Sequence, residues 1–477
     1  MRALPAILRS WTRSLLPALA ASLLLSLLFA ALSWQAAGLA PERALALLRP
    51  LVSAGALFET HRMPLGVVRI PRWYGNDCLV FAMLVLPQDE GRAREAFSPN
   101  LAVSPLLPLA MADPAGGETA PPCLRLAELL APGAERLPAK RYHRYLHGQR
   151  VATALLLPLL GPVGLQDAVF LALNGALGGL FLLAGLRAAR RRRQGDAGWR
   201  RDAGFAGIGL LLVTSYGLPA LGVWVSHALS DLVLVGFLWA LWLLPGREGA
   251  GPAWLLGAFG CGVALFEFLT GGLPLGGGLV LLMAALADRP GGALRSLAAF
   301  LAGVTLPFLL KVGIAALVFP DTLQGADAAA FEHRLFGPIA PEVPAQLLAA
   351  WSPMAGFDLH RVDESPFFRL RYLLFRLQGY YWQMGFGLGD AGRVLIRGSL
   401  IGLVLLALPA MRRDAMRAGP ALGAALLLIA WYLVFLNHSA LHAVWMARCM
   451  VIFPAALWVL ALPLLPGPRE GKAAIRR

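Results

Sequence analysis

The chain has 477 residues, of which 58% are hydrophobic and only 14% are charged, and its formal net charge is +15. Soluble globular proteins carry nearer a quarter charged residues. Apolar runs long enough to cross a hydrocarbon core of about 30 Å recur along the chain, so the sequence predicts an all-α polytopic membrane protein. The basic residues stand mostly in short loops and at the ends of apolar runs, where the positive-inside bias places them. No basic run shows the aromatic pattern of a nucleic-acid module, which argues against nucleic acid as a partner.

The first apolar run covers residues 14–38 and follows Arg2, Arg9 and Arg13. A cleaved signal peptide has an apolar core of only about 7–15 residues, so we expect a retained first transmembrane helix, residues 1–38, with a cytoplasmic N-terminus. A large outer loop, residues 39–164, follows. Its apolar pieces are too short to span a bilayer and predict helices lying at the interface. These pieces cover residues 51–57, 79–87 and 100–111.

The membrane topology follows from the basic run Arg187 to Arg193, which should be cytoplasmic. Residues 151–162 are short and end at Gly161-Pro162-Val163-Gly164, so we expect them to enter or lie on the membrane without crossing it. Residues 165–187 then form the second span and begin a bundle at 165–318. A second outer loop at 319–394 and C-terminal helices with a cytoplasmic tail at 395–477 complete the chain. The other expected spans are 203–222, 228–244, 253–270, 273–287, 296–318, 395–411, 419–436 and 443–466, which makes about ten with both termini cytoplasmic.

With this topology, several polar residues collect on the outer side of the membrane. Ionisable groups at membrane depth cost several kcal/mol unless they are paired or face water, so they are functional candidates. Glu267 between apolar neighbours and Arg448 within an apolar run are the most unusual, and they could also pair with each other. The full set expected to bind substrate from the spans is His227, Asp231, Glu267, Asn437, His438, His442 and Arg448.

Two histidine clusters suggest contacts to an anion or a sugar. His438 and His442 stand four residues apart, on one face of a helix, which allows a divalent metal. No acidic residue stands between them in a zinc-protease pattern, so hydrogen bonds to phosphate or sugar fit equally well, and no cofactor is firmly implied. The cluster His143, Arg144, His147 and Arg150 precedes the membrane, where it could bind an anion or simply form a basic belt at the lipid headgroups.

The stretch Trp73 to Cys78 holds one carboxylate, Asp77, in an aromatic, turn-prone setting. A general base that deprotonates a hydroxyl needs a carboxylate at the mouth of a partly dry site, so Asp77 is the candidate catalytic residue. Asp89, Glu90 and Glu95 are alternatives, although Gln88 to Arg92 has the composition of a solvated turn. If the loop lies on the outer side of the membrane, the oxidising compartment there allows a disulfide between Cys78 and Cys123.

A cytoplasmic N-terminus, one span, a large outer loop with interfacial helices and an acid, and then many spans resemble the GT-C class of membrane glycosyltransferases. Asn76-Asp77, Arg144 to Gly148, Phe268 to Thr270, and Asn437 to His442 with Arg448 are similar to an uncharacterised bacterial group of such proteins. The resemblance implies a sugar donor linked to polyprenyl phosphate, Asp77 as base, and Arg144, His147, His442 and Arg448 as phosphate or sugar contacts. Asp77 lies farther from the first span than this class usually places its acid.

The expected function is therefore a glycosyltransferase of the bacterial cytoplasmic (inner) membrane. It would move a sugar from a polyprenyl-phosphate donor to a glycan or lipid acceptor on the outer face, surrounded by membrane lipids. Two alternatives stay open. An oligosaccharide polymerase or ligase usually has a short first loop, and a transporter needs polar residues near the midplane and at broken helices. Here the polar residues gather on one face, which favours chemistry there.

Overall fold

The structure is a computed structural model of the chain. It describes residues 3–39, 41–62, 69–73, 75–86, 91–97, 99–102, 121–131, 139–141, 146–215, 223–244, 249–267, 271–287, 292–318, 370–371, 373–374, 377, 389–435, 439 and 446–465. Most of the expected second outer loop therefore lies outside the described residues.

The apolar runs form helices close to the bounds expected from sequence. The bundle contains α1 (Ala3–Ala36), α6 (Gly148–Gln194), α7 (Trp199–Ser215), α9 (Val225–Leu243), α10 (Ala253–Glu267), α11 (Leu273–Ala285), α12 (Ala293–Val318), α16 (Gly389–Arg413), α17 (Ala415–Val434), and the final segment η5 (Ala447–Val451), α20 (Ile452–Ala461) and η6 (Leu462–Leu464). Five of the described helices, α1, α6, α9, α12 and α17, are long and apolar enough to cross a membrane. These helices indicate an integral membrane protein, while the count of about ten spans stays a prediction.

Two of the expected spans, 253–270 and 273–287, correspond to shorter described helices. Within the described residues, α10 and α11 contain 15 and 13 residues. In α11 every residue from Pro274 to Ala285 is buried. A helix that is apolar on all sides belongs to a core, so α11 packs in the interior of the bundle instead of facing lipid.

Helix α6 is bent at the position where the sequence predicts a break. Gly161 has φ 66° and ψ 171°, a conformation outside the helical region that side-chain-bearing residues rarely adopt. Two helical pieces therefore meet at Gly161 and Pro162 without a loop between them. The expected short segment 151–162 runs directly into the expected span 165–187.

The described parts of the first loop form helices and short strands. They are α2 (Pro41–Ser53), η1 (Ala56–Phe58), β1 (Thr60–Arg62), β2 (Arg69–Pro71), α3 (Gly75–Val85), α4 (Arg92–Phe97), β3 (Asn100–Ala102), α5 (Pro121–Leu130) and β4 (Ala139–Arg141). Strands β1 and β2 pair antiparallel, as do β3 and β4. The expectation of a helix starting at residue 100 was wrong, because residues 100–102 form β3. Helix α3 covers most of the expected segment 79–87 and is largely buried within the protein, while its expected place at the membrane interface stays a prediction.

Helices α1, α10 and α12 approach one another closely through glycines. A Cβ atom added to Gly303 would lie 2.2 Å from the carbonyl oxygen of Gly257, and one added to Gly257 would lie 2.2 Å from that of Ala18. The Ser22 hydroxyl also donates a hydrogen bond to the Gly303 carbonyl at 2.9 Å. Apolar side chains gain little by leaving lipid, so close packing and such hydrogen bonds hold membrane helices together.

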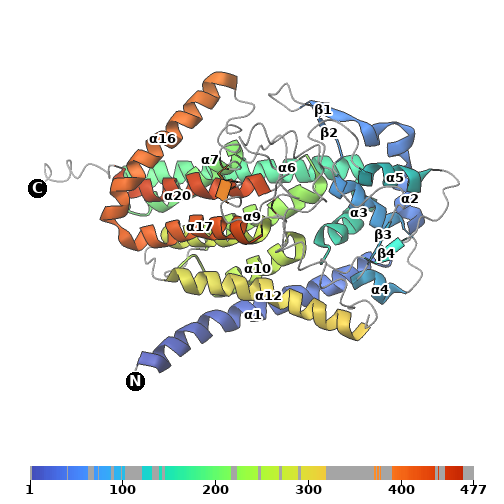
Figure 1. Ribbon diagram of the computed structural model, residues 1–477, viewed down its shortest axis with the longest axis horizontal. Helices are drawn as coiled ribbons and strands as arrows, with labels where there is room; N and C mark the ends of the chain where they lie inside the picture. The colour runs from blue at the N-terminus through green and yellow to red at the C-terminus, as the bar shows by residue number, and fades with distance from the viewer. Residues whose placement is uncertain are drawn as a thin grey trace, which may run out of the picture.

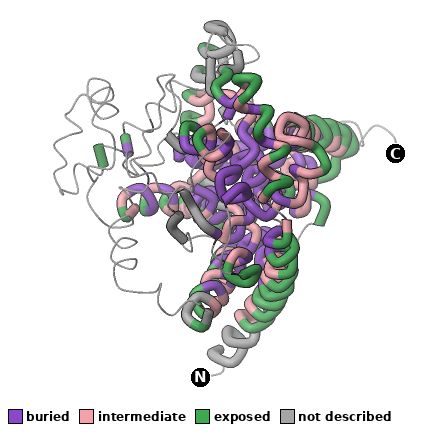
Figure 2. The backbone as a smooth tube through the Cα atoms, turned by 90° about the vertical axis from the view of Figure 1, so that its right-hand side faces the viewer, coloured by how far each residue is buried: buried purple, intermediate pink, exposed green. Residues whose placement is uncertain are grey.

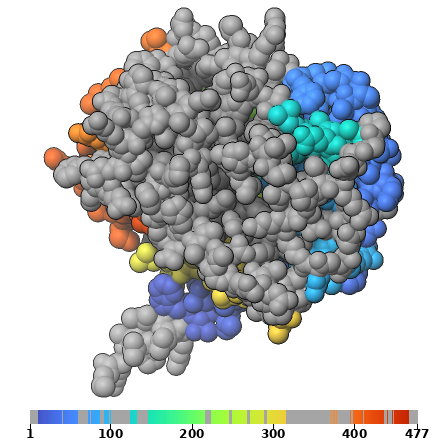
Figure 3. Space-filling model, turned by 45° about the vertical axis from the view of Figure 1, so that its right-hand side comes forward, coloured from blue at the N-terminus to red at the C-terminus, as the bar shows by residue number. Residues whose placement is uncertain are grey.

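The first-loop elements gather at one end of the bundle. In Figure 1 the start of α1 and the turn between α16 and α17 lie on the left, whereas α2 to α5 and the strands lie on the right. Figure 2 shows buried residues concentrated in the middle of the bundle and a largely exposed α1. In Figure 3 the first-loop residues form a blue-to-cyan surface opposite the orange C-terminal helices. The ends of the helices next to the first loop are where the candidate site residues lie.

Candidate functional site

The N-terminus of α9 receives the candidate base from α3. Asp77 is 1% exposed, and its Oδ1 accepts a hydrogen bond from the backbone N–H of Ser226 at 2.8 Å. Ser226 is in the first turn of α9, whose N–H groups have no partner within the helix. Beside this contact, the Asn76 side-chain nitrogen lies 3.3 Å from Nε2 of the buried His227. The start of a helix stabilises negative charge, so α9 holds Asp77 in a setting suited to a carboxylate.

The next turn of α9 carries a second set of polar contacts. Gln149, from the first turn of α6, donates to the Ser230 hydroxyl at 2.9 Å. Asp231 follows, and its Oδ1 lies 2.6 Å from Nη1 of Arg448, with both side chains 0% exposed. His227 and Asp231 are four residues apart, so they share one face of α9. The first two turns of this helix therefore collect polar side chains from α3, α6 and η5.

Two backbone contacts position Arg448. The Tyr432 hydroxyl on α17 donates to the carbonyl of Met446 at 2.9 Å, just before η5. On the other side, Cys449 donates to the carbonyl of Gly271 at 3.4 Å. Gly271 has φ 108°, and a Cβ atom there would lie 2.7 Å from the Cys449 sulfur. Only glycine fits between α10 and α11 at this point without moving η5.

A disulfide and a tryptophan hold the start of α3. The predicted bridge between Cys78 and Cys123 is present, with the two Cα atoms 4.9 Å apart, and it joins α3 to α5 next to Asp77. Trp73 is 1% exposed, donates from its indole N–H to the carbonyl of Ala56 at 3.1 Å, and meets the Phe81 ring edge-on. Asp77 thus projects from a segment fixed on two sides.

The structure brings together four of the predicted site residues: Asp77, His227, Asp231 and Arg448 all lie on or against the start of α9. Arg448 pairs with Asp231, a partner that the sequence did not indicate. Glu267 ends α10, beside Phe266, whose carbonyl accepts from Ser230 at 3.4 Å. The Glu267 side chain lies outside the described part, so its expected approach to Asp77 and its pairing with Arg448 stay predictions.

The remaining predicted residues are only partly described. His147 immediately precedes α6 and has a left-handed backbone conformation, with φ 56°. It therefore lies at the α6 end that carries Gln149. The other histidines, arginine and asparagine named from the sequence fall outside the described residues; they are His143, Arg144, Asn437, His438 and His442. Within the described ranges, no group of three or more histidine, cysteine or acidic residues could hold a metal ion.

A second buried ion pair was not selected from the sequence. Nη2 of Arg150, in the first turn of α6, lies 2.5 Å from Oε1 of Glu95 on α4, and the two side chains are 2% and 13% exposed. Burial raises the pKa of Glu95, and the nearby guanidinium groups of Arg150 and Arg92 partly counteract that rise. An arginine in the first turn of an apolar helix was the available signal. Glu95 was passed over because the neighbouring residues have the composition of a solvated turn.

Comparisons with known proteins give no relative for this chain. No family model matches it, and no match was found among curated proteins or among solved structures.

Proposed function

We propose that the protein is a membrane glycosyltransferase. It moves a sugar from a polyprenyl-phosphate donor to a hydroxyl of a glycan or lipid acceptor on the outer face of the bacterial cytoplasmic membrane. The observation that carries this proposal is the cluster at the start of α9, where a buried carboxylate, a histidine and an arginine–aspartate pair lie within two helical turns. Ionisable groups within an apolar bundle are costly, so a cluster of them favours function.

In the proposed reaction Asp77 accepts the proton of the acceptor hydroxyl. The acceptor oxygen forms a bond to the sugar, the bond from the sugar to the phosphate oxygen breaks, and polyprenyl phosphate leaves with the electron pair. Negative charge builds on the departing phosphate, where nearby cationic groups stabilise the transition state. Arg448, oriented by Asp231, belongs to the groups that offset this charge, together with the arginine and histidines of residues 143–147 and 437–442.

The substitution Asp77→Asn separates catalysis from folding. The asparagine side-chain oxygen can still accept the hydrogen bond from Ser226, but the amide cannot take up a proton as a base. Asp167→Asn is the matched control, since Asp167 is an exposed carboxylate of α6 whose neighbour Gln166 donates to the carbonyl of Val223, just before α9. The assay uses purified protein in lipid vesicles with a panel of synthetic polyprenyl-phosphate monosaccharides and a mixture of glycan and lipid acceptors that carry free hydroxyl groups, and it measures release of polyprenyl phosphate.

We expect the wild type and Asp167→Asn to release polyprenyl phosphate at the same rate. Asp77→Asn should lose at least about 100-fold in rate, the lower range for general base catalysis, while the lost interaction of its charge with the start of α9 should cost at most about 2 kcal/mol of stability. Unchanged turnover in Asp77→Asn would remove Asp77 as the base. Failure of the wild type to release polyprenyl phosphate from every donor would contradict the glycosyltransferase assignment itself.

A further inference from the structure

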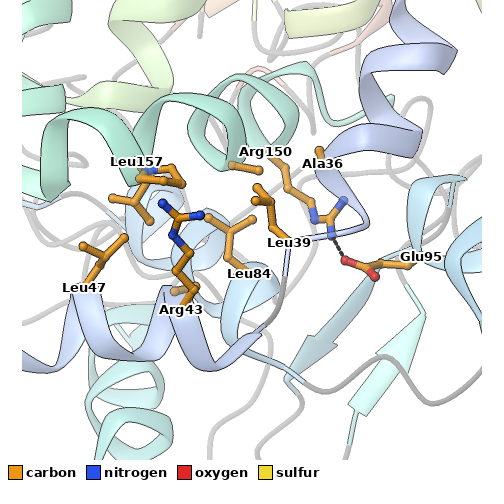
Figure 4. Close-up of a pocket in the computed structure, with 11 residues that line it drawn as sticks. Ala36, Leu39, Arg43, Leu47, Leu84, Glu95, Arg150 and Leu157 are labelled. Atoms are coloured by element: carbon orange, nitrogen blue, oxygen red, sulfur yellow. Dashed lines mark hydrogen bonds and ion pairs between the residues drawn. The ribbon is translucent and has the colours of Figure 1, made fainter.

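A groove lies at the end of α1 that meets the first loop, and Figure 4 shows the residues that line it. It is a small hollow, with an enclosed cavity volume of only about 20 Å³, and it is partly open to the surroundings. One wall is apolar and includes Leu39, which follows the end of α1, Leu84 of α3 and Leu157 of α6. The charged lining residues are Arg43 of α2, Arg150 of α6 and Glu95 of α4. We call this site the α1–α6 groove.

The α1–α6 groove carries an excess of positive charge. Its three charged side chains are two guanidinium groups and one carboxylate, which leaves one positive charge when Glu95 is ionised. Arg150 is 2% exposed and directs Nη2 to Glu95, while its buried Nε has no hydrogen-bond partner within the described part of the chain. Arg43 is exposed and reaches toward the apolar wall in Figure 4. A singly charged anion would complement this arrangement.

The surroundings of the groove place it at the depth of lipid headgroups. Trp34, in the last turn of α1, accepts a hydrogen bond from Arg92 at its carbonyl, and the Arg92 guanidinium lies 5.4 Å from the Trp34 ring. Tryptophan and arginine side chains are typical of the membrane–water interface. On the two long helices that border the groove, Leu28 of α1 and Leu159 of α6 are 53% and 77% exposed, as expected for surfaces that face lipid tails. A ligand here meets cationic groups at one end and apolar surface at the other.

We propose that the α1–α6 groove binds one anionic phospholipid of the surrounding bilayer. Its phosphate lies between Arg43 and Arg150, and an acyl chain follows the apolar wall between α1 and α6. Glu95 competes with the phosphate for Arg150 and thereby weakens binding. The site is separate from the start of α9, although Arg150 stands next to Gln149, which contacts Ser230 there. The inference does not rest on the proposed glycosyltransferase activity.

The test uses the full-length protein in detergent and native mass spectrometry of lipid binding. The probe is dioleoylphosphatidylglycerol. Dioleoylglycerol has the same tails without phosphate, and glycerol 1-phosphate has the headgroup without tails. We expect only the phospholipid to bind at micromolar concentration. An arginine near a lipid surface contributes about 1 kcal/mol, so Arg43→Gln should weaken binding about fivefold. Arg49→Gln on the exposed side of the same helix is the matched control and should have no effect.

Glu95→Gln gives a result in the opposite direction. Removing the competing carboxylate should strengthen phospholipid binding, whereas a purely structural role for the ion pair predicts no gain. Equal binding by Arg43→Gln and Arg49→Gln, or dioleoylglycerol binding as tightly as the phospholipid, would overturn the proposal. The proposal would also be overturned if undecaprenyl phosphate displaced the phospholipid and the phospholipid could not displace undecaprenyl phosphate, because that result would assign the groove to a polyprenyl lipid.

Discussion

Replacing Arg448 by methionine removes the positive charge of a fully buried ion pair and leaves Asp231 desolvated. The two charged groups have an N–O distance of 2.6 Å and 0% exposure. Two unit charges about 4 Å apart attract by about 4 kcal/mol at an effective dielectric constant near 20. Breaking a buried pair by removing one partner typically costs about 3–5 kcal/mol. We therefore expect Arg448→Met and Asp231→Leu each to lower the free energy of unfolding by about that amount.

The double variant Arg448→Met/Asp231→Leu should be destabilised by much less than the sum of the single variants, because neither charge remains. Equilibrium unfolding of the four proteins in one mixed-micelle system measures this coupling. The matched control is Arg417→Met, since Arg417 and its partner Asp414 are 26% and 33% exposed and such a pair contributes about 0–1 kcal/mol. Single-variant effects that add to within about 0.5 kcal/mol would refute the buried-pair reasoning.

Three further predictions concern packing, cross-linking and charge. Gly303→Ala should destabilise the protein by at least about 1–3 kcal/mol, because the new Cβ would lie 2.2 Å from a backbone oxygen. Gly313→Ala on the same helix is the control, since its Cβ meets nothing within 4 Å. Equal melting temperatures of the two variants would count against the close packing of α12. Reduction of the bridge between Cys78 and Cys123, which are 45 residues apart, should lower the free energy of unfolding by about 2–4 kcal/mol, measured by thermal unfolding. The Cys78→Ser/Cys123→Ser variant is the control and should not be destabilised further when reductant is added. Burial raises the pKa of Glu95 above its ordinary value of 4.5, so the folded state favours the protonated side chain. The contribution of this shift to the free energy of unfolding is therefore complete below pH 4.5 and is lost as the pH rises through the folded-state pKa. The wild type should therefore gain stability relative to Glu95→Gln as the pH falls from 7 to 4.5. A loss of stability relative to Glu95→Gln over this range would mean that the pKa of Glu95 is lowered in the folded state.

The helical framework was largely predictable because apolar runs in a membrane protein must satisfy their backbone hydrogen bonds internally. The expected spans at 228–244 and 296–318 correspond to α9 and α12, and Gly161 marks the bend in α6. The expected bridge between Cys78 and Cys123 also followed from having two thiols in one loop. Three-residue strands such as β1 were not predicted, because so short a segment shows no alternation of apolar and polar residues.

The pairing of charged residues was less predictable than the helices. Arg448 could be recognised as unusual from its apolar neighbours, but its partner depends on how η5 packs against α9. Asp231 is 217 residues away in sequence. Glu267 was expected as a partner because it also is an acidic residue between apolar neighbours. Arg150 was grouped with a basic belt, although its burial and its contact with Glu95 arise only when α4 folds against α6. Hydropathy gives the depth of a side chain in the membrane but not the direction in which it points.

The cluster at the start of α9 allows a structural and a catalytic interpretation, and the contacts themselves separate the two. As a structural element, Asp77 caps the buried start of α9 and Asp231 neutralises Arg448, so each costly group has a stabilising partner. A purely structural cluster should tolerate replacement of the ion pair by apolar residues of similar volume. A catalytic cluster should regain its fold in the Arg448→Met/Asp231→Leu variant but not its turnover, because the cationic group would be missing when the phosphate leaves. Recovery of both stability and turnover in that variant would assign the pair to folding and move the phosphate contacts to residues 143–147 and 437–442.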